Sequence, residues 1–165
     1  MAKECSFDVV SQVNAQEIDN AFQQTKKELL QRYDLKGSGS SIEYAKGDGT
    51  VIIVAPSDFM IDQVLDIFNT KLIRRQIDIK SLKWGKSIPS AKGNVTRVAT
   101  IIQGIDQDLC RTINKDIKAE KFKAKVTIEQ DKLRVSSASK DELQKVIGFL
   151  REKDYGQPLQ YINYR

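Results

Sequence analysis

Residues 50–68, TVIIVAPSDFMIDQVLDIF, decide the fold, because residues 132–150, KLRVSSASKDELQKVIGFL, repeat their apolar pattern 82 positions later. In each stretch two apolar residues in alternation indicate a short strand. A serine follows, and after it come apolar residues at the i+4, i+7, i+8 and i+11 spacing of an amphipathic helix. The matched helix positions are Ser57, Ile61, Val64, Leu65 and Phe68 in the first copy and Ser139, Leu143, Val146, Ile147 and Leu150 in the second. The chain therefore contains two copies of one strand–helix pattern.

The same offset continues on both sides of this pattern. The corresponding apolar residues are Ile42/Tyr44 and Ala124/Val126 upstream, and Ile77/Ile79 and Leu159/Tyr161 downstream. Turn residues precede the repeated strands: Gly47 and Gly49 in the first copy and Gln130-Asp131 in the second, which suit the positive φ angles of hairpins. Each copy is therefore predicted to contain a hairpin, a helix and a further strand.

Helix N-caps indicate where the helices begin. Asn14 with Glu17 forms a capping box, in which each side chain can satisfy the backbone amide of the other residue, and Ser139 with Glu142 repeats it. The other two N-caps are Ser57 and Asp106. The predicted helices cover 14–32, 57–74, 106–119 and 139–152, and the predicted strands cover 5–11, 38–45, 50–55, 77–83, 95–103, 123–129, 132–136 and 159–164.

This order of elements predicts an α+β protein of two tandem ferredoxin-like (βαββαβ) domains, each an antiparallel four-stranded sheet with two helices on one face. The expected domains are residues 1–86 and 91–165, with a linker within 85–94, where Pro89 and several glycines and serines occur. A terminal strand at 5–11 can join either sheet, and the sequence leaves that choice open.

Composition excludes most kinds of chemistry. The chain has 165 residues and no histidine, so it contains no His-based nucleophile pair, metal ligand or general base. Cys5 and Cys110 have no metal-binding spacing, and Gly85-Lys86-Ser87 lacks the first glycine of a P-loop. No apolar run approaches the ~18 residues of a membrane span, and no secretory signal is evident. We therefore expect a cytoplasmic protein that is not an enzyme and needs no cofactor, metal or membrane.

The net charge of +5 is concentrated in clusters. Residues 71–86 carry six positive charges and one negative, and residues 111–125 carry six positive and two negative. Such clusters attract polyanions. The third strands of the two sheets lack the aromatic residues with which many RNA-binding sheets stack bases. Alternation instead predicts a basic and hydroxyl-bearing open face on the second sheet, formed by Lys123, Lys125, Thr127, Lys132 and Arg134.

Several short motifs stand out along the chain: Ser6–Ser11 (SFDVVS), Arg32–Gly37 (RYDLKG), Lys71–Arg75 (KLIRR), Gln103–Asp106 (QGID) and the terminal Gly156–Arg165 (GQPLQYINYR). Together they resemble the bacterial YajQ family of nucleotide-binding proteins. The resemblance covers essentially the whole chain. It implies two RNP-like domains without known catalytic activity that bind nucleotides or RNA, including tRNA, and in some members cyclic di-GMP. Ile102 stands where the family pattern has a lysine, which removes one phosphate contact.

We therefore predict a non-enzymatic protein that binds a nucleotide (GTP, ATP or cyclic di-GMP) or an RNA such as tRNA through its phosphates. The predicted contacts are Arg32, Lys36, Lys71, Arg74, Arg75, Lys123, Lys125 and Arg134, with Tyr161, Tyr164 and Arg165 as stacking or clamping residues. Core packing is the other interpretation of the tyrosines. The alternative function is a protein-interaction adaptor that pairs with a regulator, and a Lys- or Cys-dependent enzyme is a third.

Overall fold

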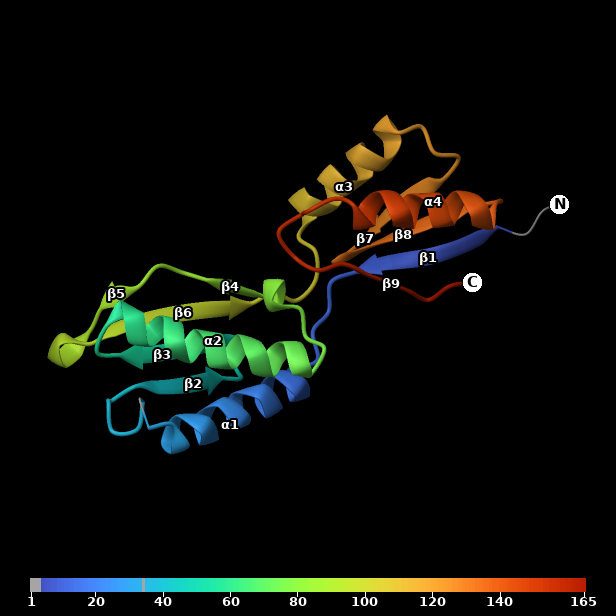
Figure 1. The fold of residues 1–165 in the computed structure, drawn as a ribbon. Coiled ribbons are helices and arrows are strands. Elements are labelled where there is room, and N and C mark those ends of the chain that lie inside the picture. The colour runs from blue at the N-terminus through green and yellow to red at the C-terminus, as the bar shows by residue number, and fades with distance from the viewer. Residues whose placement is uncertain (1–3, 34) are drawn as a thin grey trace. The chain divides into compact units, whose positions relative to one another are not determined.

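The computed structural model describes residues 4–33 and 35–165, which form four α-helices and two antiparallel sheets (Figure 1). The predicted α+β class with two ferredoxin-like domains is confirmed. The chain divides into two compact units, which we call the split unit (residues up to 12 and from 103 to 165) and the inserted unit (13–102). No helix within the described residues is long and apolar enough to cross a membrane.

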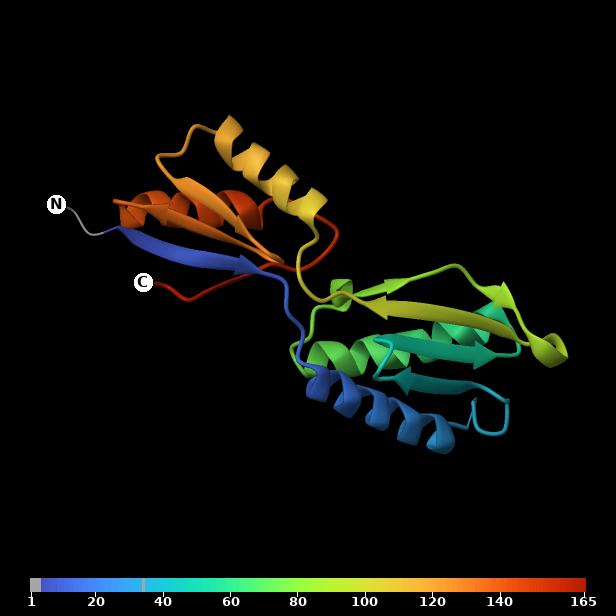
Figure 2. The same ribbon diagram turned by 180° about the vertical axis from the view of Figure 1, so that it is seen from behind.

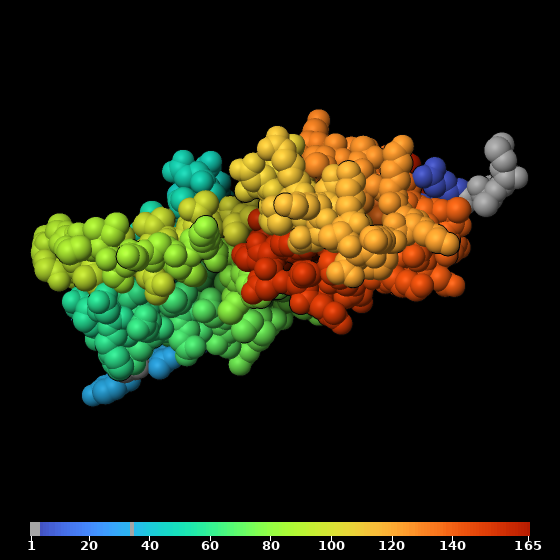
Figure 3. Space-filling model, turned by 90° about the horizontal axis from the view of Figure 1, so that it is seen from above, coloured from blue at the N-terminus to red at the C-terminus, as the bar shows by residue number. Residues whose placement is uncertain are grey.

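The split unit is a four-stranded sheet in the order β7-β8-β1-β9, with helices α3 and α4 packed on one side. Phe7 and Val9 of β1 are completely buried against that side, together with Val146 of α4. Its elements are β1 (Cys5–Val10), α3 (Gln107–Ala119), β7 (Lys125–Glu129), β8 (Lys132–Ser137), α4 (Lys140–Arg151) and β9 (Gln160–Ile162). The segment after α4 lies against α3 (Figure 3). The Tyr155 hydroxyl of this segment donates to Asp116 of α3 at 2.7 Å.

The inserted unit has a second sheet in the order β2-β3-β6-β4, and β5 also pairs with β6. Its helices bury Ile18, Phe22, Val64 and Phe68 against β3 and β6. Its elements are α1 (Ala15–Gln31), β2 (Ser41–Ala45), β3 (Thr50–Ala55), α2 (Asp58–Arg74), the 3-10 turn η1 (Ile79–Ser81), β4 (Leu82–Trp84), β5 (Ile88–Pro89), the 3-10 turn η2 (Ala91–Gly93) and β6 (Val95–Ile101).

The two sheets have exchanged their first strands relative to the chain order. β1 precedes α1 in sequence but pairs with β8 and β9, whereas β6 precedes α3 but pairs with β3 and β4. In Figure 2 the blue strand β1 accordingly runs beside the orange strand β8. With β6 counted as the first strand of the inserted unit, both sheets have the same ferredoxin-like strand order.

The compact units therefore differ from the expected domains 1–86 and 91–165. The chain passes between the units at Gln12–Val13 and again at Ile102–Gln103. The expected linker at 85–94 lies within the inserted unit, because β5 pairs with β6 and the Gly85 amide donates to the Val98 carbonyl at 2.8 Å. The strand at 5–11, whose partner the sequence left open, belongs to the split unit.

Predicted helix starts and hairpin turns are confirmed. The side chains of Asn14, Ser57, Asp106 and Ser139 all accept hydrogen bonds from backbone amides of the first helical turn. The last strand is shorter than predicted because Asn163 has a φ of +57°. This left-handed residue forms a bulge: Asp8 pairs with Ile162, but two residues earlier Ser6 pairs with Arg165 through both backbone hydrogen bonds.

Candidate functional site

The open face of the split unit carries two cross-strand rows of polar side chains. In the first row Lys125 on β7 is opposite Ser136 on β8, and Ser136 is opposite Ser6 on β1. In the second row Thr127 is opposite Arg134, and Arg134 is opposite Asp8. Opposed residues of antiparallel strands point to the same face. The predicted outward direction of Lys125, Thr127, Lys132 and Arg134 agrees with this register.

Asp8 fixes the cations of this face. Its side chain is buried, with 1 % of the residue exposed, although it lies on the side away from the helices. Arg134 Nε donates to one carboxylate oxygen at 3.2 Å, and Lys132 Nζ donates to the other at 3.3 Å. Asn163 Nδ2 donates to the same carboxylate at 2.8 Å, which joins β1 to the segment after β9. Arg134 and Lys132 therefore extend toward Asp8 on β1 and remain partly exposed.

Hydrogen bonding also sets the charge of Asp8. Burial by itself raises the pKa of a carboxyl group, but hydrogen bonds from Asn163, Arg134 and Lys132 outweigh burial, and the pKa lies below the ordinary value of 3.8. Asp8 is therefore negatively charged at neutral pH and neutralises part of the basic face. The face is consequently less basic than the sequence of β7 and β8 alone predicts.

A hollow of about 320 Å³ lies over the two rows. Its lining consists of Glu4, Ser6, Lys125, Thr127, Glu129, Arg134 and Ser136. Arg134 is held by Asp8 and by Glu129 at 3.4 Å, whereas Lys125 is exposed and has no ion pair within residues 4–33 and 35–165. The hollow thus combines the unpaired ammonium group of Lys125 with three hydroxyl groups, the Arg134–Glu129 ion pair and the carboxylate of Glu4. The ammonium and hydroxyl groups can donate hydrogen bonds to anionic oxygens.

The other predicted residues of the split unit are distributed around this face. Lys123 is exposed just before β7. Tyr161 is on the helix side, where its ring meets Phe7 edge-on at 6.0 Å and Arg151 lies 5.5 Å from its centroid. Burial raises the pKa of the Tyr161 hydroxyl. Tyr164 and Arg165 line a separate hollow together with residues of α4.

A third hollow, of about 480 Å³, lies in the inserted unit where α1 meets the end of α2. The predicted contacts Lys71, Arg74 and Arg75 line it, together with Glu17, Gln24 and Gln76. Lys71 pairs with Glu28 at 2.8 Å and Arg75 with Glu17 at 3.1 Å, so these two cations connect the helices. Arg74 is exposed and makes no ion pair with the described residues.

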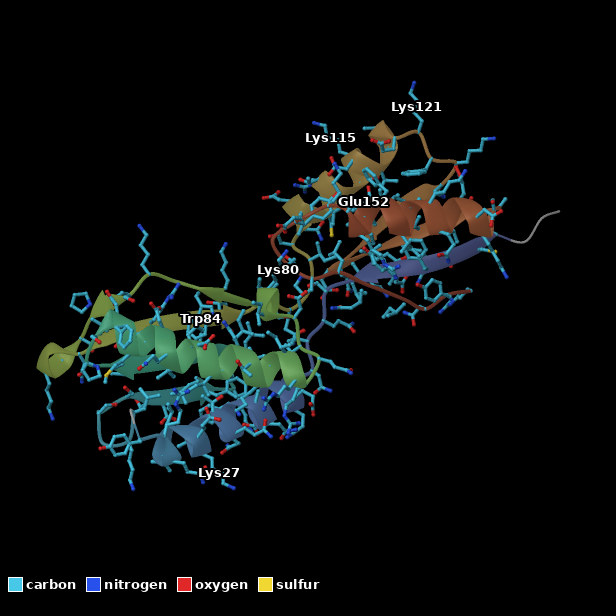
Figure 4. All side chains as sticks on the ribbon, in the orientation of Figure 1. Lys27, Lys80, Trp84, Lys115, Lys121 and Glu152 are labelled. Carbon is cyan, nitrogen blue, oxygen red and sulfur yellow. The ribbon has the colours of Figure 1, made fainter. Side chains whose placement is uncertain are left out.

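The remaining predicted cations do not line any of these hollows. Arg32 is the C-cap of α1 and pairs with Glu28 at 3.8 Å, and Lys36 is exposed in the following turn. The basic run 111–125 also does not form one surface. Lys115 and Lys121 point outward from α3 and the turn after it (Figure 4), whereas Lys125 lies on the open face of the sheet.

Sequence reasoning missed four residues of the open face: Ser6, Asp8, Ser136 and Asn163. Ser6 and Asp8 alternate with the buried Phe7 and Val9, so their direction was readable from the sequence. Their partners were not, because the sheet that β1 joins was undetermined. Asn163 is two residues after Tyr161, so regular alternation would place it on the helix side, whereas its left-handed conformation turns its amide toward Asp8.

The described residues contain no group of three or more His, Cys, Asp or Glu side chains placed to hold a metal ion. Cys110 is completely buried, its thiol donates to the Ile105 carbonyl at 3.6 Å, and burial raises its pKa. A buried thiol of raised pKa is a poor nucleophile.

Comparison with known proteins shows the family to which the chain belongs. Residues 5–165 match the family described as "Nucleotide-binding protein YajQ-like". The chain belongs to that family. It is 46 % identical over 165 residues to a "Nucleotide-binding protein" of Desulfitobacterium hafniense and 42 % identical over 165 residues to one of Chloroherpeton thalassium, each match covering 100 % of both chains. A relative from Geotalea uraniireducens with the same name is 44 % identical over 97 % of this chain and 98 % of its own.

Proposed function

We propose that this protein binds nucleotides through their phosphate and ribose groups on the open face of the split unit. The observation that carries the proposal is the row Lys125–Ser136–Ser6, in which an unpaired ammonium group and two hydroxyl groups line one hollow. Phosphate oxygens accept hydrogen bonds from all three groups, and the ammonium charge adds electrostatic attraction. The family name and the relatives' names support a nucleotide as the ligand.

The composition of this face favours contacts with the phosphate and ribose groups of a ligand over recognition of its bases. Its two cross-strand rows consist of cations, hydroxyl groups and the carboxylate of Asp8, with Ile162 opposite Asp8, and they contain no aromatic ring. Such a face suits ligands that share phosphate and ribose groups, namely GTP, ATP, cyclic di-GMP and single-stranded parts of RNA such as tRNA. We propose binding without catalysis, in line with the inert environment of Cys110. The cytoplasmic location stays a prediction.

In the inserted unit, Arg74 marks a second place where a phosphate of a longer ligand can bind. Its guanidinium group makes no ion pair with residues that the structure describes, and it lines the hollow between α1 and α2. Lys71 and Arg75 contribute less to this contact, because each is already paired with a glutamate. Arg32 and Lys36 are peripheral contacts for an extended RNA only.

The experiment compares two charge reversals in the full chain by titration calorimetry with GTP, cyclic di-GMP and tRNA. Lys125→Glu is expected to weaken binding about tenfold or more, since it removes a phosphate contact and adds repulsion. Lys115→Glu is the matched control, because it makes the same charge change in the same unit away from the sheet face. Raising the salt concentration is expected to weaken wild-type binding. Equal effects of the two reversals would contradict a site on the open face.

One observation favours the alternative function of a protein-interaction adaptor. The open face of the inserted unit carries Ile52, Val54 and Val98 in cross-strand positions beside Ile88, which is 60 % exposed. β-branched apolar side chains on an open sheet suit contact with another protein. This function would be favoured if the protein bound none of GTP, cyclic di-GMP and tRNA and copurified with a protein regulator.

A further inference from the structure

A small hollow of about 290 Å³ in the split unit lies beside the proposed phosphate-binding face. It is lined by Cys5, Ser6, Lys140, Leu143, Gln144, Tyr164 and Arg165. Ser6, near the start of β1, also lines the hollow over Lys125, so the two hollows share this residue, although that one lies on the open face and this one on the helix side of the sheet. Their chemistry differs, because this one contains an aromatic ring and the side chain of Leu143.

The ring of Tyr164 is both exposed and held in place. The residue is 58 % exposed, yet its ring packs on buried Phe7 with a centroid distance of 6.1 Å. The next residue, Arg165, pairs with Ser6 through backbone hydrogen bonds of 3.2 and 3.0 Å. An exposed aromatic ring that is already ordered loses little conformational entropy when a flat ligand stacks on it.

The bulge at Asn163 creates this arrangement. Without an extra residue, Tyr164 would be opposite Ser6 and would point to the open face. The left-handed conformation of Asn163 shifts the register by one residue, so the Tyr164 ring turns to the Phe7 side. The hydrogen bond from Asn163 to Asp8 connects the same bulge to the cations of the open face.

We propose that the base of the bound nucleotide stacks on Tyr164 in this hollow. The inference rests on the proposed function and names the part of the ligand that the open face does not bind. Leu143 provides an apolar contact for the flat base, and the Gln144 amide can both donate to and accept from the base edge. Lys140 and Arg165 provide cations beside the ribose and phosphates. A nucleotide that occupies both hollows passes around the end of the sheet near the start of β1, where Ser6 belongs to both linings.

The test measures binding of GTP and of inorganic tripolyphosphate to the full chain by titration calorimetry. Loss of one base–aromatic contact is expected to weaken GTP binding about tenfold in Tyr164→Ala and to leave tripolyphosphate binding unchanged. Tyr164→Phe keeps the ring and is expected to bind GTP like wild type. Tyr33→Ala is the matched control, because Tyr33 is 99 % exposed and belongs to the inserted unit.

A second variant tests the contact without removing the ring. In Tyr164→Trp, GTP is expected to quench indole fluorescence beyond any change seen with wild type, whose single tryptophan is Trp84, and tripolyphosphate is expected not to. Base stacking would be overturned if Tyr164→Ala bound GTP like wild type, or if it lost affinity for GTP and tripolyphosphate equally. It would also be overturned if GTP caused no added quenching in Tyr164→Trp. Lys125→Glu with undiminished tripolyphosphate binding would overturn the phosphate site instead. Failure of wild type to bind either probe would overturn both.

Discussion

At the scale of single residues, Asp8 determines how the open face presents its charge. A carboxylate on an exposed sheet face is ordinarily solvated, but Asp8 is covered by Lys132, Arg134 and Asn163. The two cations are partly exposed, with 32 % and 36 % of their side chains accessible, so solvent screens part of the attraction. Asp8 therefore positions Arg134 and also contributes to stability.

We predict that Asp8→Asn lowers the free energy of unfolding at neutral pH by about 2 kcal/mol, since it weakens charge-assisted hydrogen bonds to a buried group. The pKa of Asp8 is lowered below 3.8 by folding, so its contribution is present above that pH and is lost as the pH falls through the folded-state pKa. Urea unfolding of both proteins should show the difference at neutral pH and a smaller one at about pH 3. Asp48→Asn, in an exposed turn, is the control. A difference independent of pH would contradict the charge network.

Two glycines with the same φ of +82° allow backbone strain to be separated from close packing. At Gly104 an added Cβ would lie 2.6 Å from Asp131 Oδ2 and 2.9 Å from Asp131 Cβ, whereas at Gly156 nothing lies within 4 Å. We expect Gly156→Ala to destabilise the protein by about 1 kcal/mol through strain alone. Gly104→Ala should cost about 2 kcal/mol or more, because Asp131 must also move. Thermal unfolding measures both, and equal losses would show that the contact with Asp131 has no cost.

At the scale of helices and strands, the sequence predicts which residues face the core but not which strands pair. Alternation and N-caps located all four helices, and the repeated apolar positions form the two hydrophobic clusters, with Val64 in one and Val146 in the other. Strands β1 and β6 both carry alternating apolar residues, so the sequence pattern does not tell which sheet each strand joins. Pairing depends on contacts far apart in sequence, which periodicity does not report.

Because strand pairing is not readable from the sequence, only part of the candidate site could be predicted. Alternation predicted the direction of Lys125 and Arg134, because both lie on neighbouring strands of one hairpin. Ser6 and Asp8 joined them only once β1 was placed between β8 and β9. The position of Tyr164 depends on the bulge at Asn163, and an asparagine is only weakly diagnostic of a left-handed residue.

The exchange of first strands predicts which fragments fold. Residues 13–102 contain every strand of the inserted unit, so this fragment should fold alone and unfold cooperatively. Residues 1–88 lack β6, which lies between β3 and β4, and keep β1 without its partners. That fragment should show little cooperative unfolding by circular dichroism. A cooperatively folded 1–88 fragment would contradict the exchange.

At the scale of the whole molecule, duplication has given two sheets with the same strand order and different open faces. The split unit presents Lys125, Arg134 and hydroxyl groups, whereas the inserted unit presents Ile52, Val54 and Val98. The shared order follows from the same apolar positions in both copies, and the surfaces are free to differ because outward residues do not affect the core. We therefore propose phosphate binding on the open face of one sheet only.

Backbone amide chemical shifts of the isotope-labelled full chain, recorded during titration with GTP, test that assignment most directly. We predict the largest shifts at Ser6, Lys125, Thr127 and Ser136, on three neighbouring strands of the split unit. In Lys125→Glu these shifts should require about ten times more GTP or fail to appear, while Lys115→Glu should titrate like wild type. Shifts confined to residues 13–102 at saturating GTP would contradict the account.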